Sequence, residues 1–446
     1  MLHAFVHPVY APKYPPAQSA FLALGDLLGD PFYGVLLSGA LFAAAVCWML
    51  QAFVRPAWSL IGGIATALYF GAGHYWTESY WGGAVGALGA ALSIGAFGRM
   101  QRDGRCGWLF GLGAAILLFS RPYEGGVLIA LLGIVLLVRR ARSLLPALIP
   151  ALIAIAMLGV YNRAITGSPF KLPYRVYTEQ YAGREQFWFL PAPAKIAYTN
   201  PAIGEVFQNY DLAEYREIRE LSIPGRLWRN VLMILSTIWY DGGLAALLPL
   251  LFIPFLRRDP DVRFFGSCLA VLFGSLLILV LPFMHYMAPL LVAITLTDLL
   301  VLDRLWCLRS VRSRDRVMIV ALLAAAFLYG PAMRAVHATR GETSPLYRGD
   351  GFGFVRARMT DDILAHPGDH LVFVRWSPSK PVMPPWVANS AQFEKSRIIW
   401  AHDRGAENRE LIDSYPNRHF WLLEDDSQGV RIAPYPETPL LESASR

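Results

Sequence analysis

The stretch HYWTESYWGGAVGALGAALSIGAFGRMQRDGRCGWLFGLGAAILLFSRPYEGG, residues 74–126, decides the fold of the chain. It contains two apolar runs, 82–98 and 107–120, which predict two helices. The arginine-bearing turn RMQRDGRC joins these runs, whereas aromatic residues and glycines flank them at their other ends. Because basic loops stay on the cytoplasmic side of a membrane, the pattern predicts a helical hairpin with its turn in the cytoplasm.

The same alternation recurs over most of the 446 residues, of which 55% are hydrophobic and only 16% charged. Predicted membrane helices cover residues 32–54, 57–76, 82–98, 107–120, 123–139, 144–161, 243–256, 264–281, 287–302 and 317–333. Several ranges are shorter than the roughly 20 apolar residues that a bilayer requires, so we expect tilt or extension into flanking segments such as 227–240. The fold class is therefore mainly α, a polytopic transmembrane bundle of about ten helices.

The distribution of charge orients this bundle. The connections RRARS, RRDPDVR and DRLWCLRSVRSRDR are rich in arginine, whereas SRPYEGG and LPFMHYM are nearly neutral. We therefore expect a multi-pass protein of the inner (cytoplasmic) membrane, with the N-terminus, segment 162–242 and tail 334–446 on the outer side. The net charge of +7 does not predict nucleic-acid binding, because the basic residues form no continuous face.

The four cysteines agree with this orientation. Cys47 and Cys268 fall within predicted membrane helices, and Cys106 and Cys307 fall in predicted cytoplasmic loops. No cysteine lies in the two large outer segments, where an oxidising compartment would allow disulfide bonds. We predict no disulfide and find no cysteine spacing typical of a metal site.

The tail differs in composition from the rest of the chain. Three short apolar runs, HLVFVRW, RIIWAHD and HFWLLED, alternate there with helix-like pieces such as ENRELIDSYPNR. This alternation predicts a small extracytoplasmic α/β domain over 334–446, beside a transmembrane domain over 1–333. No glycine-rich phosphate loop follows a predicted strand, so nucleotide binding is unsupported. Asp403, just after the second strand, is either a ligand residue or the cap of a turn.

Candidate functional residues gather at the predicted outer face. Ionisable groups next to membrane helices are costly to keep and are functional candidates by default. The N-terminal cluster brings His7, Tyr10, Lys13 and Tyr14 ahead of two prolines that stiffen the loop. The other three clusters are Glu78 among aromatic residues, Arg121 and Glu124 around Pro122 and Tyr123, and His285 with Tyr286.

Each cluster also has a structural explanation. Tyrosine and tryptophan anchor membrane proteins at the interface, so the aromatic residues around Glu78 fit an anchoring belt. Arg121 and Glu124 can pair with each other, and a single histidine such as His285 often only packs. The convergence of two cations, a carboxylate and a histidine on one face instead favours a site for an anionic, partly lipidic substrate.

Five motifs carry a resemblance to a known family. They are APKYPPAQSAFLALG, ESYWGGAVGALGAAL, LLFSRPYEGG, MHYMAPL and RIIWAHDRGAENRELIDSYPNRHFWLLE, and they span almost the whole chain in order. The sequence resembles bacterial GT-C type membrane glycosyltransferases, the glycosyltransferase family 39-like group related to protein mannosyltransferases and aminoarabinose transferases. The resemblance implies transfer of a sugar from a polyprenyl-phosphate donor to an acceptor on the outer side of the cytoplasmic membrane, with inversion at the sugar carbon, as expected of a cell-envelope enzyme.

The chain departs from the family pattern at its start. The family carries an acidic residue in its first outer loop, and the KYPP turn resembles the end of that loop. No Asp or Glu precedes Asp26, however. We expect that the missing helix and acidic motif belong to an N-terminal segment absent from this sequence; otherwise the chain uses another acid.

The resemblance and the residue chemistry together imply a set of roles. Lys13 and Arg121 would hold the donor phosphate, while Glu78 would be the general base or a metal-binding carboxylate. The remaining predicted substrate-binding residues are Tyr14, Tyr123, Glu124, His285 and Tyr286, with Glu124 orienting Arg121. Segment 162–242 would cover the site and form an acceptor groove. No metal ligands are assigned, the need for a divalent metal stays open, and the expected partners are membrane lipids, the polyprenyl-phosphate-linked sugar and an unidentified glycan, lipid or protein acceptor.

Two other functions are compatible with parts of the pattern. A transporter or lipid-carrier flippase would also be polytopic, although such proteins place polar groups near the bilayer midplane and the chain shows no convincing internal repeat. A non-catalytic, truncated relative would bind a glycan or a partner without producing a product. The absence of an early acidic residue gives this second alternative its weight.

Overall fold

The chain folds into two compact units, each described by itself below. The helical unit comprises Phe5–Ala194 and Glu214–Tyr347, and the smaller unit comprises Met1–Ala4, Lys195–Ala213 and Arg348–Arg446. The computed structural model describes residues 4–5, 7–71, 73–181, 184–193, 196–198, 204, 207–208, 212–242, 244–307, 312–339, 352–376, 386–390, 392–427 and 429–436. Residues 340–351 lie outside these ranges, so the domain boundary expected near residue 333 stays a prediction.

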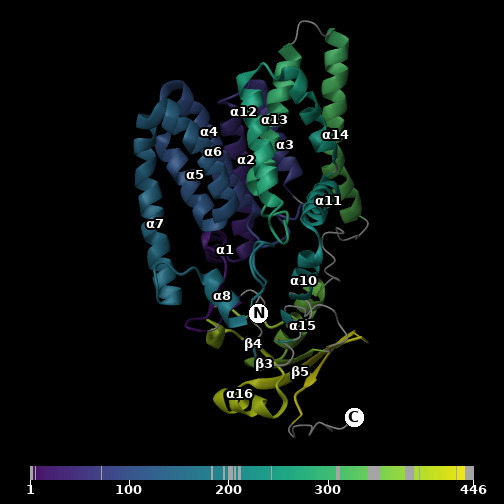
Figure 1. Cartoon of the computed structure of the whole chain (residues 1–446). Coiled ribbons are helices and arrows are strands. Elements are labelled where there is room, and N and C mark those ends of the chain that lie inside the picture. The colour runs from purple at the N-terminus through teal and green to yellow at the C-terminus, as the bar shows by residue number, and fades with distance from the viewer. Residues whose placement is uncertain are drawn as a thin grey trace. The chain divides into compact units, whose positions relative to one another are not determined.

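Helices make up almost all of the described part of the larger unit (Figure 1). They are α1 (Ala17–Leu27), α2 (Pro31–Leu50), α3 (Pro56–Tyr69), α4 (Gly83–Asp103), α5 (Gly107–Ser120), α6 (Pro122–Arg140), α7 (Leu145–Thr166), α8 (Pro173–Tyr181), α11 (Ile223–Gly242), α12 (Pro260–Leu276), α13 (Ala288–Cys307) and α14 (Ser313–Thr339). The short helix η1 (Ala141–Leu144) joins α6 to α7. Two paired strands of two residues each, β1 (Ala4–Phe5) and β2 (Ala11–Pro12), precede α1. Helix α10 (Leu212–Glu220) contains the residue at which the smaller unit gives way to the larger one along the chain. The mainly helical class is confirmed.

The number of membrane spans is not confirmed. Among the described residues, three stretches are long and apolar enough to cross a membrane: Pro31–Leu50, Gly83–Asp103 and the α6–α7 stretch Pro122–Thr166. The range 243–256 forms the 3-10 helix η3 (Leu244–Leu256) instead of an α-helix. Pro249 and Pro254 lie inside it and cannot donate the backbone hydrogen bonds of an α-helix.

Two predicted helices end early, and both early ends shape the candidate site. Helix α3 ends at Tyr69 because Gly71 and Gly73 follow, the latter with a φ of 76°. Helix α12 ends at Leu276, after which the Val280 amide donates to the Gln186 carbonyl at 2.9 Å. The chain after α12 therefore pairs with the long segment before α10 and then delivers His285 and Tyr286.

Helix α7 presents a surface that water would not stabilise. Its exposed side chains include Ile149 at 66%, Leu152 at 62% and Val160 at 70% relative exposure. Contiguous apolar surface of this kind marks a membrane or protein interface. Together with the three long apolar stretches, it makes the hydrocarbon of a bilayer the surroundings that suit the helical unit.

Helix α4 lies at the centre of the unit because its residues are small. A Cβ on Gly89 would lie 3.0 Å from the Gly113 carbonyl oxygen, and one on Gly113 would lie 2.7 Å from that of Gly89. Glycines on both helices thus let α4 and α5 approach closely, as is typical of helix pairs in membranes. On another side α4 packs on α13, which is buried along most of its length.

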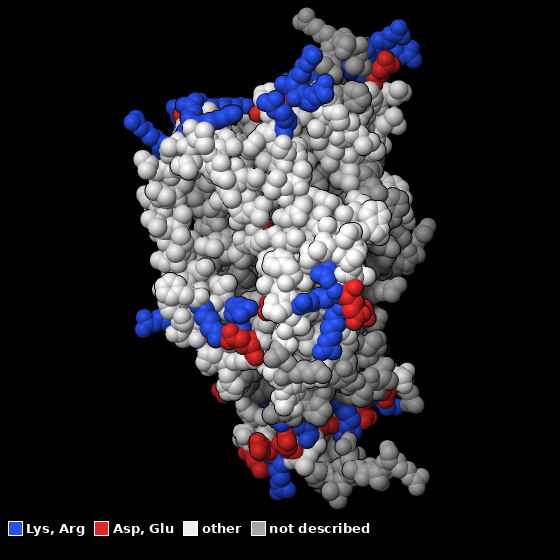
Figure 2. Space-filling model, viewed as in Figure 1, with Lys and Arg blue, Asp and Glu red and all other residues white. Residues whose placement is uncertain are grey.

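Arginine-rich turns meet at one end of the helical unit. Arg55, before α3, bonds to Asp303 at the end of α13 over 2.5 Å, and Arg304 bonds to Asp259 before α12 over 2.7 Å. Figure 2 shows Lys and Arg side chains gathered along this end. Such clustering is what the expected orientation requires, whereas the cytoplasmic placement of this end stays a prediction.

The smaller unit contains the predicted α/β fold. Its sheet has the order β4 (Ile398–His402), β3 (His370–Trp376), β5 (His419–Asp426), β6 (Gly429–Pro434), with the first three strands parallel and β6 antiparallel to β5. Helices α15 (Phe352–Leu364) and α16 (Asn408–Ser414) complete it, with the short helices η4 (Phe393–Lys395) and η5 (Gly405–Glu407). The three predicted strands are confirmed, and β6 was not predicted. The Asp403 carboxylate accepts from the Gly405 amide at 3.1 Å, so it caps a turn.

Candidate functional site

Lys13 lies in a cage of aromatic rings. It follows β2, and Pro15 and Pro16 fix the chain that leads into α1. Its Nζ lies 4.1 Å from the ring centroid of Tyr177, 5.3 Å from that of Tyr14 and 5.7 Å from that of Tyr174. Ring faces attract a cation electrostatically, so the cage keeps the charged amine in place without neutralising it.

Arg121 lies at the turn between α5 and α6 and is only 8% exposed. Its Nη2 donates to the Trp81 carbonyl at 2.6 Å, and its Cζ lies 5.1 Å from the Tyr286 ring centroid. Gly86 on α4 makes room for it, because a Cβ there would lie 3.0 Å from Arg121 Cγ. Among the described residues its Nε has no hydrogen-bond partner, which leaves a buried donor for a ligand.

His285 joins the same group of rings. It stacks on Trp81 with centroids 5.4 Å apart and an interplanar angle of 7°, and it is 3% exposed. The Tyr75 hydroxyl lies 3.0 Å from its Nδ1. Because the tautomer of His285 sets which atom donates, this contact fixes the ring without fixing its proton.

The phenols around these cations stay neutral at physiological pH. Burial raises the pKa of Tyr14, Tyr75 and Tyr286, which keeps each hydroxyl protonated. Tyr14 meets Trp81 edge to face at 5.9 Å, and its hydroxyl bonds to that of Tyr286. We call Lys13, Tyr14, Tyr75, Trp81, Arg121, Tyr174, Tyr177, His285 and Tyr286 the cation–aromatic cluster.

Glu124 and Tyr123 lie close to Arg121 in sequence, but neither side chain forms a hydrogen bond with it among the described residues. Glu124, in the first turn of α6, is 3% exposed, and no ion pair within 4.0 Å joins it to Arg121 in the described part of the chain. Its Oε1 has no hydrogen-bond partner among the same residues. The Tyr123 hydroxyl donates to the Ser275 carbonyl of α12 at 2.9 Å. Arg121 is thus held by Trp81. No direct contact between Glu124 and Arg121 among the described residues supports the expected orienting role of Glu124.

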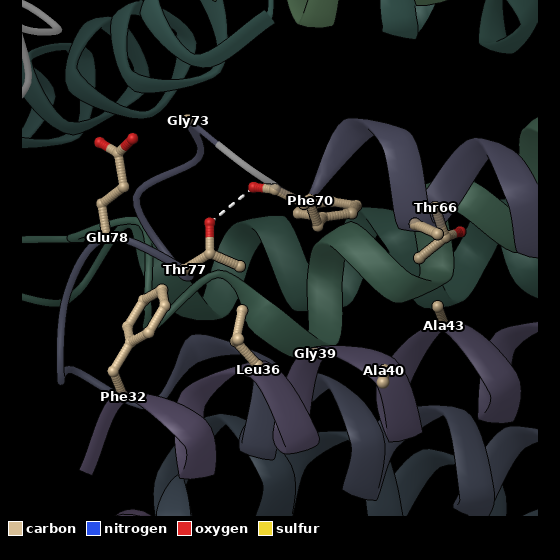
Figure 3. A pocket seen from close by; sticks show the side chains of 12 residues that line it. Phe32, Leu36, Gly39, Ala40, Ala43, Thr66, Phe70, Gly73, Thr77 and Glu78 are labelled. Carbon is tan, nitrogen blue, oxygen red and sulfur yellow. Dashed lines mark hydrogen bonds between the residues drawn. The ribbon is translucent and has the colours of Figure 1, made fainter. Parts of the chain in front are cut away.

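Glu78 lines a cavity of about 320 Å³ between α2 and α3. Figure 3 shows Ala40 and Ala43 on one wall, Thr66 and Phe70 across from them, and Glu78 at one end. The Glu78 side chain is exposed. It shares its loop with Tyr75 and Trp81, so this loop, residues 70–82, contributes both to the cavity and to the cation–aromatic cluster.

The structure therefore brings together five of the predicted residues: Lys13, Tyr14, Arg121, His285 and Tyr286. It adds four aromatic residues to them. Tyr75 and Trp81 were interpreted as part of a membrane belt, and the pair on α8 was missed. The spacing of Tyr174 and Tyr177, three residues apart on one helix face, was the available signal. No group of three or more His, Cys, Asp or Glu suited to a metal occurs among the described residues.

Comparisons with known proteins add a distant structural likeness. No protein-family model matches the sequence, and no curated protein matches it. The crystal structure of an Archaeoglobus fulgidus oligosaccharyltransferase with Zn and sulfate is similar at a TM-score of 0.46 and 11% identity, over 94% of this chain and 60% of that chain. The oligosaccharyltransferase AglB from Archaeoglobus fulgidus, in complex with an inhibitory peptide and a dolichol-phosphate, is similar at a TM-score of 0.39 and 11% identity. This likeness covers 99% of this chain and 68% of that chain. This chain thus spans 60% of the length of the first, and likeness at this level assigns no activity.

Proposed function

We propose that the protein is an integral membrane glycosyltransferase of the GT-C type that takes a sugar from a polyprenyl-phosphate donor. One observation carries the proposal. Five segments far apart in the sequence place two cations, Lys13 and Arg121, among neutral phenols and a histidine within the helical unit. A structural helix bundle has no need to collect these groups around a buried cationic donor.

The chemistry of the cluster suits a lipid-linked phosphate. A guanidinium and an amine bind phosphate oxygens through charge-assisted hydrogen bonds, and Arg121 Nε is a donor that no described residue uses. Neutral phenols add donors without adding negative charge. Aromatic faces are suited to pack against a sugar ring, and within the cluster His285 stacks on one face of Trp81.

Two carboxylates are candidates for the general base. The sequence analysis assigns Glu78, which lines the cavity between α2 and α3. Glu124 is the carboxylate nearest to Arg121 in sequence and is buried. Transfer assays of Glu78→Gln and Glu124→Gln decide between them, because a base contributes about 100-fold or more to such a step.

The direct test uses the full chain reconstituted in liposomes. Binding of polyprenyl phosphate is compared with binding of the matching polyprenol, and a radiolabelled polyprenyl-phosphate sugar is then supplied with an envelope extract as acceptor. Phosphate-dependent binding together with labelled product supports the proposal. Labelled lipid that crosses the membrane intact indicates a flippase, and binding without product indicates a non-catalytic relative. No preference for the phosphate overturns the proposal.

A further inference from the structure

The α6–α7 stretch Pro122–Thr166, called here the α6–α7 hairpin, has the most exposed apolar surface of the three long apolar stretches. Only 11% of its most apolar part is buried, against 44% for Pro31–Leu50 and 89% for Gly83–Asp103. In a bilayer, lipid chains therefore contact this hairpin directly. The exposed apolar side chains around its turn are Ile134, Leu137, Val138, Leu145, Leu148 and Ile149.

Three arginines lie within four positions at the turn of this hairpin. Arg139 and Arg140 end α6, and Arg142 lies in η1. All three are exposed, and among the described residues none of their side chains forms an ion pair. They differ in this from Arg55 and Arg304, whose charges carboxylates neutralise. The turn therefore keeps a concentrated positive charge directly beside an exposed apolar surface.

The length of α6 places these arginines at the level of lipid headgroups. The 19 residues of Pro122–Arg140 measure about 28 Å at 1.5 Å per residue, close to the roughly 30 Å of bilayer hydrocarbon. Trp108, at the start of α5, is 56% exposed, as is typical of an indole at the membrane interface. A Cβ on Gly107 would lie 2.3 Å from the Ser143 carbonyl oxygen, so α5 starts directly against η1. Trp108 and the arginines thus mark the same boundary.

We propose that the turn of the α6–α7 hairpin binds an anionic phospholipid whose phosphate is its only charged group, as in phosphatidylglycerol. The phosphate accepts charge-assisted hydrogen bonds from Arg139, Arg140 and Arg142. The acyl chains lie along the exposed apolar side chains of α6 and α7.

Charge complementarity selects this occupant. Its headgroup must offset three cations while its body covers apolar surface, and an anionic lipid does both. Phosphatidylcholine carries a fixed cation beside its phosphate, which the arginines repel. A second copy of the chain docked symmetrically on this turn would bring three further arginines to it, and like charges oppose that contact.

This site is separate from the cation–aromatic cluster and goes beyond the proposed function. Arg121 directly precedes α6, whereas Arg139 lies in the last turn of the same helix. The two places are therefore about 28 Å apart along the helix axis. A phosphate held by Lys13 and Arg121 makes no use of the hairpin turn.

The test measures lipid retention on the full chain by native mass spectrometry after purification in detergent. Phosphatidylglycerol and phosphatidylcholine of identical chains serve as probes. A cation at headgroup level contributes about fivefold, so three arginines should favour phosphatidylglycerol by about 100-fold. Equal retention of the two lipids overturns the headgroup assignment. Glycerophosphoglycerol, the headgroup without chains, is added in excess. Full displacement of the lipid by this soluble headgroup overturns the contact with α6 and α7.

Two triple variants locate the binding. Arg139→Gln, Arg140→Gln and Arg142→Gln together should abolish the preference for phosphatidylglycerol. The matched control replaces three exposed arginines around the start of α12 by glutamine, namely Arg257, Arg258 and Arg263. We expect the control to keep the preference. An equal loss in both variants would show diffuse attraction to every exposed arginine, and an unchanged preference in the first would place the lipid elsewhere; either result overturns the site.

A milder variant guards against misfolding of the triple variant. Arg142→Gln alone changes one exposed side chain of η1 and should weaken phosphatidylglycerol retention by about fivefold. Thermal unfolding in detergent should be the same as for the unchanged chain. A folded Arg142→Gln protein with full retention would remove Arg142 from the site and contradict the proposed set of three.

The outcome is independent of the glycosyltransferase proposal. The first triple variant should keep polyprenyl-phosphate binding, and Arg121→Met should keep phosphatidylglycerol retention. Loss of both ligands in either variant would overturn the claim of two separate sites. A protein that retains phosphatidylglycerol but binds no polyprenyl phosphate would keep the lipid site and reject the proposed function, and the converse result would reject the lipid site alone.

Discussion

The arginines of the helical unit have two different kinds of partner. At the arginine-rich end, Arg55 and Arg304 both bond to Asp303, which is 2% exposed, and Arg304 also bonds to Asp259. In the cation–aromatic cluster, Arg121 bonds to a carbonyl and lies over a ring, and no carboxylate lies within 4.0 Å of it in the described part of the chain.

The difference separates a structural use of charge from a binding use. Carboxylates neutralise the cations at the first end, and their hydrogen bonds tie the ends of α3, α12 and α13 together. A buried guanidinium without a carboxylate keeps its positive field, which attracts an anion. The same residue type thus closes the bundle at one place and prepares a binding site at another.

The largest expected effect comes from removing the cation of the cluster. Arg121→Met should lower sugar transfer by about 100-fold, because loss of one positioned donor to developing charge has this magnitude. Arg99→Met is the matched control, since Arg99 likewise donates to a carbonyl, that of Trp48, and lies over the Trp48 ring at 3.9 Å. Steady-state transfer from a labelled donor measures both. An equal loss in the two variants would show that Arg121 acts through folding.

Removing the acid at the other end should affect stability and leave donor binding intact. Asp303→Asn withdraws a buried partner from Arg55 and Arg304, and breaking such a network costs several kcal/mol when all partners are buried. Because the Arg55 side chain is 46% exposed, water replaces part of the lost contact and about 1–2 kcal/mol is expected. Thermal unfolding in detergent measures the change. If the variant kept its stability but lost polyprenyl-phosphate binding, Asp303 would serve binding and the structural role assigned to this end would be wrong.

The sequence predicted the helices well because their apolar runs are long and local. Ranges such as 82–98 and 107–120 fall on α4 and α5, whose glycines and alanines pack within the same short stretch of chain. One failure comes from a non-local contact. The end of α12 at Leu276 depends on a hydrogen bond between Val280 and Gln186, which no local pattern encodes.

The candidate site shows the same division. Lys13, Arg121 and His285 could be selected from sequence because charges beside apolar runs are conspicuous. Their tyrosine neighbours on α8 were not selected, since tyrosine is common at membrane interfaces and its role depends on which cation it meets. Glu78 was selected as the only acid of its loop, yet the structure places it in the cavity between α2 and α3.

A smaller effect is expected when only the hydrogen bond between Tyr75 and His285 is removed. Tyr75→Phe keeps the ring and deletes the hydroxyl that lies 3.0 Å from Nδ1. Transfer should fall by less than about tenfold, because one neutral hydrogen bond contributes roughly 1 kcal/mol. Tyr215→Phe removes a buried hydroxyl that donates to the Leu190 carbonyl, away from the cluster, and serves as the control. A loss as large as that of Arg121→Met would give the histidine a catalytic role instead of a positioning one.

The smallest expected effect is the absence of a pH response where free tyrosine begins to ionise. Burial raises the pKa of Tyr14 and Tyr286, whereas an unperturbed phenol has a pKa of about 10. Because the phosphate carries constant charge above its last pKa of about 6, affinity for polyprenyl phosphate should stay flat from about pH 8 to 9.5. Ordinary phenols would begin to form phenolate in this range and repel the phosphate. Binding titrations on the full chain and on Tyr286→Phe separate the cases. A decline in affinity that begins near pH 9 and disappears in the variant would show that the cluster holds an ionising phenol. That result would contradict the interpretation of the cluster as an anion-binding site.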